Sequence, residues 1–126
     1  MQTEESFSDY QTRMLRTTKE ITRLTHEISA KSVSDPHELG NLTQNLYGQY
    51  NQLAEDSRGA QGTASSDNIS QRIRSSVQEL GRSTIDLIKT AGSVQGHPTD
   101  TYIKDELSRS SKLVIEKVLF TSSSTV

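Results

Sequence analysis

The sequence predicts an all-α protein, an antiparallel up-and-down bundle of four helices in one domain, residues 1–126. Apolar residues recur at steps of three and four along four segments, the period of an α-helix that buries one side. Short polar segments rich in Gly, Ser or Pro separate them, and no segment alternates as a half-buried strand does. Long helices joined by short loops favour antiparallel neighbours.

The first helix is expected at about residues 6–31. Its main apolar residues are seven apart, with a second row between them: Phe7, Met14, Ile21 and Ile28, then Tyr10, Thr17 and Leu24. This spacing is also that of a coiled coil. A bundle helix is the preferred interpretation, because a sustained coiled coil has more heptads and more leucine.

The second helix is expected at about residues 36–56. Asp35 resembles an N-cap, Pro36 stands at the first helical position and Glu38 completes a capping-box pattern. One apolar side follows, formed by Leu39, Leu42, Leu46, Tyr47, Tyr50 and Leu53. The stretch 58–67 is rich in Gly and Ser without periodicity, which predicts a loop.

The third helix, at about residues 67–91, has the clearest apolar stripe and is expected to be the helix on which the others pack. Ser66 or Asp67 is its expected cap. Gly81 within it either costs about 1 kcal/mol relative to Ala or permits close approach of another helix. The stripe consists of Ile69, Ile73, Val77, Leu80, Leu87, Ile88 and Ala91.

The fourth helix is expected at about residues 100–119, after a break at Gly92 and Pro98. Thr99 or Asp100 is its expected cap, and residues 120–126 are expected to form a disordered tail. Its expected inner side consists of Tyr102, Ile103, Leu107, Ser110, Leu113, Val114 and Val118.

The composition argues against several classes of function. A net charge of −2 creates no field that attracts nucleic acid, and no segment approaches the roughly 20 apolar residues that span a membrane. Cysteine is absent, which excludes disulfides and thiolate metal sites. The N-terminus lacks the apolar run of a signal peptide, so a soluble, intracellular protein is expected. Only 30% of residues are hydrophobic, which predicts a thin core and marginal stability.

No pattern in the sequence supports catalysis, a cofactor or a metal. His26-Glu27 begins like the zinc motif H-E-x-x-H, but Ala30 replaces the second histidine. No nucleophile elbow or phosphate-binding loop follows a credible strand. The chain is therefore predicted not to be an enzyme.

Charged residues offer two candidate surfaces. Arg72, Arg74, Arg82 and Lys89 could bind an acidic partner, but acidic residues are mixed among them and a solvated side is the preferred interpretation. Acidic residues gather at the start of the fourth helix: Asp100, Asp105 and Glu106. They either complement the helix dipole or form an anionic docking point for a basic surface.

Several ordered blocks resemble the talin family, without gaps from about Glu5 to Val118. They read SFSDYQT at 6–12, PHELG at 36–40, VQELG at 77–81, KTAG at 89–92 and PTDTY at 98–102. The best match is the ninth helical bundle of the talin rod. The resemblance implies a module of a cytoplasmic adaptor at cell–matrix adhesions, with adjacent rod bundles as neighbours, linking integrin indirectly to actin.

The resemblance also implies a docking site. This rod bundle packs on the talin FERM head and keeps talin autoinhibited, and Glu106 matches a glutamate on its fourth helix that pairs with a lysine of the head. Ile103, one turn earlier, matches a threonine, so the surface is partly altered. The expected protein-binding residues are Asp100, Ile103, Asp105 and Glu106.

Two departures from the family pattern matter. The family bundle has five helices, so with four the third helix is expected to lack a neighbour and to leave an apolar groove. Ser76, Gly81 and Thr84 make the third helix a poor vinculin-binding helix, so vinculin binding is not predicted. The alternative function is a free-standing structural protein that self-associates through the groove.

Overall fold

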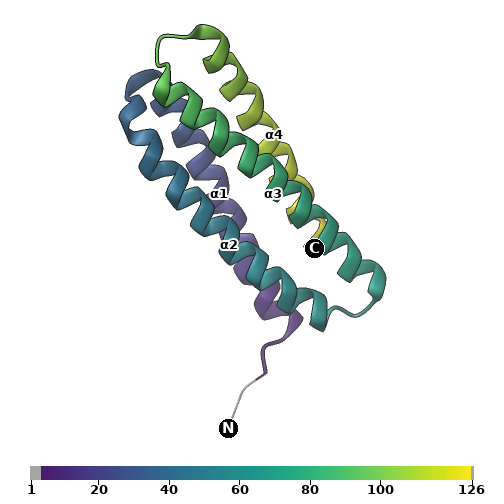
Figure 1. Ribbon diagram of the computed structural model, residues 1–126. Helices are drawn as coiled ribbons and strands as arrows, with labels where there is room; N and C mark the ends of the chain where they lie inside the picture. Colours follow the sequence, from purple (N-terminus) through teal and green to yellow (C-terminus); the bar gives the residue numbers. More distant parts are fainter. Residues whose placement is uncertain (1–3, 126) are drawn as a thin grey trace.

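The computed structural model describes residues 4–125, and the chain in this range forms an antiparallel bundle of four α-helices (Figure 1). A 3₁₀ turn, η1, spans Pro36–Glu38. Each helix packs against the next one in the chain, and α4 returns to pack against α1. The predicted all-α bundle is confirmed, with helix bounds α1 Phe7–Ser34, α2 Leu39–Thr63, α3 Asp67–Gly96 and α4 Thr101–Thr125.

The return of α4 onto α1 closes the ring of helices. α3 therefore has α2 on one side and α4 on the other, with α1 across the core. The prediction that α3 lacks a neighbour and leaves an apolar groove was wrong for the described residues. Self-association through that groove therefore loses its structural basis. All four helices contribute to a single core: Met14, Ile21, Leu24, Ile28, Leu39, Leu46, Leu53, Ala60, Ile73, Val77, Leu80, Leu87, Ala91, Val94, Leu107, Val114 and Val118.

All four helices end later than predicted, α1 by three residues. In α2, α3 and α4 packing outweighs local propensity. The expected loop 58–67 is helical up to Thr63, where Ala60 is fully buried in the core. Helix α3 continues past Gly92 to Gly96 and buries Val94. The prediction of a disordered tail was wrong for residues 120–125, because α4 runs to Thr125 with Thr121, Ser124 and Thr125 buried. Residue 126 lies outside the described range.

The helix caps follow the sequence in some places only. Ser6 and Asp9 form a reciprocal capping box at α1, and the Ser66 hydroxyl accepts a hydrogen bond from the backbone N–H of Ile69 at the start of α3. The predicted box at Asp35 was wrong. Its side chain makes no capping bond, its N–H instead closes α1 on the Lys31 carbonyl, and α2 starts only at Leu39, after η1.

Two glycines allow neighbouring helices to approach closely. A Cβ at residue 81 would lie only 2.7 Å from Cζ of Tyr50 and closer still to its hydroxyl oxygen. A Cβ at residue 59 would lie 2.5 Å from Cδ1 of Tyr10. Both distances are well inside van der Waals contact, so each tyrosine ring occupies the space that a side chain would take. The close-approach interpretation of Gly81 is confirmed, and Gly59 repeats it between α1 and α2.

Hydroxyl groups take part in the core beside the apolar side chains. Most buried hydroxyls donate to the carbonyl three or four residues earlier in the same helix, as Thr25 does to Ile21 at 2.8 Å and Ser83 to Leu80 at 2.9 Å. Thr84 differs: it is 1% exposed, and among the described residues its hydroxyl is the buried side-chain group without a hydrogen-bond partner. Burying an unpaired hydroxyl is destabilising by roughly 1–3 kcal/mol.

We therefore expect Thr84→Val to raise the free energy of unfolding by about 1–2 kcal/mol, because it removes an unpaired polar atom and keeps the shape of the side chain. Urea denaturation followed by circular dichroism measures the change. Thr25→Val is the matched control, since its hydroxyl is bonded, and a smaller or opposite effect is expected there. Equal stabilisation by both variants would contradict the assignment of Thr84 as the unpaired group.

Candidate functional site

The start of α4 is held by Asp100. Its Oδ1 accepts hydrogen bonds from the backbone N–H groups of Tyr102 at 3.0 Å and Ile103 at 3.3 Å. These are donors that the first turn of a helix leaves without an intrahelical partner. The carboxylate of Asp100 is thus occupied in forming the helix, so its contribution to a docking surface is to set where α4 begins.

The other three predicted binding residues lie on the first two turns of α4 but differ in what they offer to a partner. Ile103 is half-buried and packs against the core. Asp105 is exposed, whereas Glu106 is half-buried and lines a groove between α3 and α4. The structure therefore leaves two carboxylates, those of Asp105 and Glu106, available for binding.

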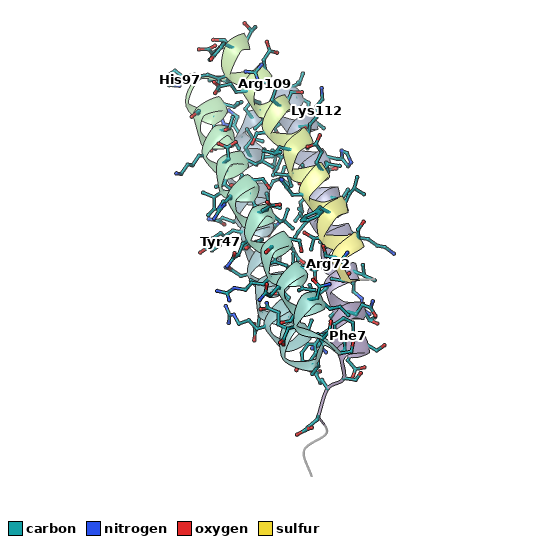
Figure 2. All side chains as sticks on the ribbon, turned by 90° about the vertical axis from the view of Figure 1, so that its right-hand side faces the viewer. Phe7, Tyr47, Arg72, His97, Arg109 and Lys112 are labelled. Carbon is teal, nitrogen blue, oxygen red and sulfur yellow. The ribbon has the colours of Figure 1, made fainter. Side chains whose placement is uncertain are left out.

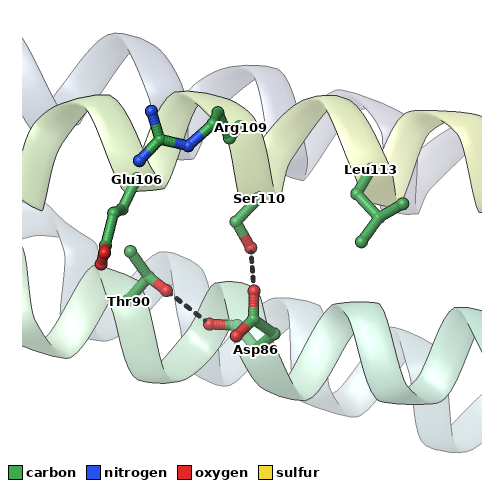
Figure 3. A pocket seen from close by; sticks show the side chains of 6 residues that line it. All are labelled: Asp86, Thr90, Glu106, Arg109, Ser110 and Leu113. Atoms are coloured by element: carbon green, nitrogen blue, oxygen red, sulfur yellow. Dashed lines mark hydrogen bonds between the residues drawn. The ribbon is translucent and has the colours of Figure 1, made fainter.

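The groove beside Glu106 joins polar groups of α3 and α4 (Figure 3). The Ser110 hydroxyl donates to Oδ2 of Asp86 at 2.8 Å, and the Thr90 hydroxyl donates to the Asp86 backbone carbonyl at 2.8 Å. The side chain of Glu106 points from α4 toward α3, in the same direction as Ser110. Glu106 and Asp86 thus place two carboxylates on one groove, which Arg109 also lines. The excess of negative charge favours a cationic group of a partner.

A second hollow continues the groove along the two helices. Leu113 lines both hollows and is 41% exposed. At the far end the ammonium of Lys117 lies 3.4 Å from a carboxylate oxygen of Glu79. The α3–α4 face, by which we mean the lining of these two hollows, therefore has an acidic end, an apolar centre and a mixed-charge end. Its residues are Glu79, Arg82, Ser83, Asp86, Thr90, Glu106, Arg109, Ser110, Leu113 and Lys117.

Sequence reasoning missed part of this face because it placed Leu113 and Tyr102 on the inner side of the fourth helix. Tyr102 is 67% exposed, and the buried side of α4 instead passes through Ser111 and Thr121. Ser110 was placed on the inner side correctly, but Ser111 and Thr121 were not, because small polar residues give a weak signal of burial. Asp86 and Arg109 were missed for another reason: only the pairing of α3 with α4 brings them together.

The arrangement places charged and apolar groups side by side on one face. Among residues 4–125, no three His, Asp or Glu side chains gather as a metal site requires. No described helix combines the length and apolar character needed to cross a bilayer. The groups whose pKa values shift lie elsewhere: the Arg13 guanidinium, hydrogen-bonded to Glu5, lowers the pKa of that carboxyl, and burial raises the pKa of Tyr50.

Comparison with known proteins gives one family. The family described as "Vinculin Binding Site" matches residues 6–125. The chain is 42% identical over 115 residues to Talin-1 of Gallus gallus, covering 91% of this chain and 4% of that protein. It is 40% identical over 113 residues to Talin-2 of Homo sapiens, covering 90% and 4%. Talin of Oscarella pearsei is 38% identical over 115 residues, covering 91% and 4%. The chain thus spans a small part of these relatives.

Replacing Asp100 by Ala is expected to lower the free energy of unfolding by about 1 kcal/mol, because two N–H groups of α4 lose their acceptor. Asp105→Ala removes an exposed carboxylate with no hydrogen-bond partner among the described residues, so its effect should stay within about 0.5 kcal/mol. Thermal or urea denaturation of both variants distinguishes the cap from the free carboxylate. Equal destabilisation by both would contradict this division of roles.

Proposed function

This chain belongs to the vinculin-binding-site family as a helical bundle of the talin rod, a structural adaptor and not an enzyme, and from that premise we propose that it docks on the talin FERM head. In that role it masks the head and helps to keep talin autoinhibited. Within the whole protein it acts as a cytoplasmic module at cell–matrix adhesions, beside adjacent rod bundles, between integrin and actin.

The observation that carries the docking proposal is the position of Glu106. Its carboxylate lies at a groove, half-buried, with Asp86 on the opposite helix. A lysine of a partner entering there would meet two carboxylates, and Leu113 would give an apolar contact further along the groove. Partly desolvated charges discriminate between partners more strongly than fully exposed ones, which suits a specific intramolecular contact.

The packing of the bundle supports docking as a folded unit. The apolar stripes of the four helices are buried, and the α3–α4 face is formed by side chains from both helices. A partner that binds this face therefore requires α3 and α4 to be packed in their native register. Docking should stabilise the bundle against unfolding, because a ligand that binds only the folded state shifts the equilibrium toward it.

Glu106→Lys is expected to weaken binding of this chain to a talin FERM head by about tenfold or more, because a like charge replaces the attraction for a cationic partner. Isothermal titration calorimetry with the purified head measures the affinity. Glu116→Lys is the charge-matched control, since Glu116 is exposed on the same helix away from the groove. Equal weakening by both variants would remove Glu106 from the docking site.

A second candidate function, binding of vinculin, is favoured by the family description itself, which names a vinculin-binding site over residues 6–125. This partner was not predicted from the sequence, because Ser76, Gly81 and Thr84 weaken the apolar pattern of the third helix. We propose that vinculin binds one helix of the bundle by its apolar stripe. In α3 this stripe includes Ile73, Leu80 and Leu87, which are fully buried, so the bundle must open before the stripe is accessible.

If opening precedes vinculin binding, the apparent affinity depends on the stability of the bundle. A stabilisation of about 1.4 kcal/mol by Thr84→Val should weaken the apparent affinity about tenfold, and the destabilising Asp100→Ala should strengthen it. Binding of the vinculin head to each variant, followed by fluorescence anisotropy, measures both changes. Affinities that do not change with the stability of the bundle would contradict opening before binding. They would indicate that vinculin binds the surface of the closed bundle.

A further inference from the structure

Tyr50 holds α2 to α3 through its hydroxyl group. The hydroxyl donates a hydrogen bond to the backbone carbonyl of Val77 at 2.9 Å. The ring end lies against Gly81, in the space where any other residue would carry a Cβ. The fit therefore depends on a phenol group that ends in an unmodified oxygen.

The same side chain lines a groove that carries positive charge. Arg58 of α2 and Arg74 of α3 line this groove together with the amides of Gln61 and Gln78. Within the described range 4–125, no carboxylate lines it. A group with negative charge on the Tyr50 hydroxyl would thus find two guanidinium groups nearby, and guanidinium pairs with phosphate oxygens in a bidentate manner.

We propose that Tyr50 is a tyrosine phosphorylation site whose modification releases α3 from α2. A tyrosine kinase would supply the reaction with ATP: the phenol oxygen forms a bond to the γ-phosphorus, and the bond from this phosphorus to the β,γ-bridging oxygen breaks. ADP leaves, and the hydroxyl proton passes to a base of the kinase. This inference concerns a face of the bundle other than the docking face and does not depend on head binding.

The phosphorylated side chain cannot keep its native position. The hydroxyl that donated to Val77 becomes a phosphate ester oxygen without a hydrogen, so the hydrogen bond to the carbonyl is lost. The added group is larger than the space against Gly81, where even one carbon atom would overlap with the ring. Three further oxygens and nearly two negative charges are excluded from that contact, and the ring must leave it toward the arginines.

The other tyrosines with described side chains lack this combination. Tyr47 and Tyr102 are 56% and 67% exposed, so a phosphate on either can extend into solvent. Tyr10 lies on Gly59, but burial and the nearby carboxylate of Glu5 raise the pKa of its hydroxyl, and this carboxylate would repel a phosphate. Tyr47 is the best control, because it stands one turn before Tyr50 on the same helix.

The first test incorporates phosphotyrosine site-specifically at residue 50 or at residue 47 of the 126-residue chain. Phosphate at residue 50 should raise the unfolded-to-folded ratio by about 10- to 100-fold, and hydrogen exchange should accelerate along the α2–α3 contact. Phosphate at residue 47 should change the ratio by less than about threefold. Equal stability of the two modified proteins would overturn the proposal.

The second test asks whether the site can be modified. A broad-specificity tyrosine kinase and ATP are incubated with the chain until Tyr47 and Tyr102 are fully phosphorylated. Peptide mass spectrometry of samples taken over time then measures the fraction of Tyr50 that carries phosphate. Phosphate at Tyr50 is expected, and it should appear later than at the exposed tyrosines and earlier in Gly81→Ala, which displaces the ring. Absence of phosphate at Tyr50 from the parent chain would overturn the proposal, whether or not the Gly81 variant folds.

Discussion

Burial of hydroxyl groups beside a small number of apolar side chains is the constraint on which this bundle depends. A desolvated hydroxyl must find an acceptor, and the nearest one in a helix is the carbonyl three or four residues earlier. Thr17, Thr25 and Ser76 all use such carbonyls, so they enter the core without a partner on another helix. These bonds fix little between helices. The attachment of helix to helix is left to the apolar stripes and to a few specific contacts.

Those specific contacts are concentrated where two helices come closest. The rings of Tyr10 and Tyr50 lie on glycines of the next helix, and Ser110 and Asp86 join α4 to α3. Arg13 links α1 to the buried Asp56 of α2 at 3.2 Å. Each contact rests on only one or two side chains. A bundle held in this way can be fully closed and still open when one contact is altered. This property suits a module that binds one partner through its surface and another through a buried helix.

A small number of specific contacts also determines the geometry of the α3–α4 face. Asp100 sets the start of α4, and the pairing of Ser110 with Asp86 sets how α4 lies against α3. Glu106, one turn before Ser110, is thereby directed to the groove (Figure 3). Figure 2 labels Arg109 and Lys112 on α4, and Arg109 lines the groove beside Glu106, so a positive group borders the two carboxylates. The orientation of a partner would follow from this uneven distribution of charge.

The sequence was sufficient for the number, order and type of the helices, because Met14, Ile21 and Ile28, for example, repeat at a helical period that no strand would show. It was insufficient for their ends. Gly59, Gly62 and the serines after Phe120 favour loops locally, yet they lie in helices because Ala60 and Thr121 are buried against other helices. Only part of the candidate site was predictable. Glu106 could be named from the family resemblance, whereas Asp86 lies beside it because of the register of α3 against α4. The hydrophobic period of each helix carries no information about that register.

The most direct test of this account is a titration of the isotope-labelled chain with unlabelled talin FERM head, followed by amide chemical shifts. The account predicts that the chain stays folded and that the perturbed amides gather around Asp86, Glu106, Arg109 and Leu113. Perturbations centred on α1 and α2, or loss of the dispersed spectrum on binding, would contradict docking of a closed bundle through the α3–α4 face.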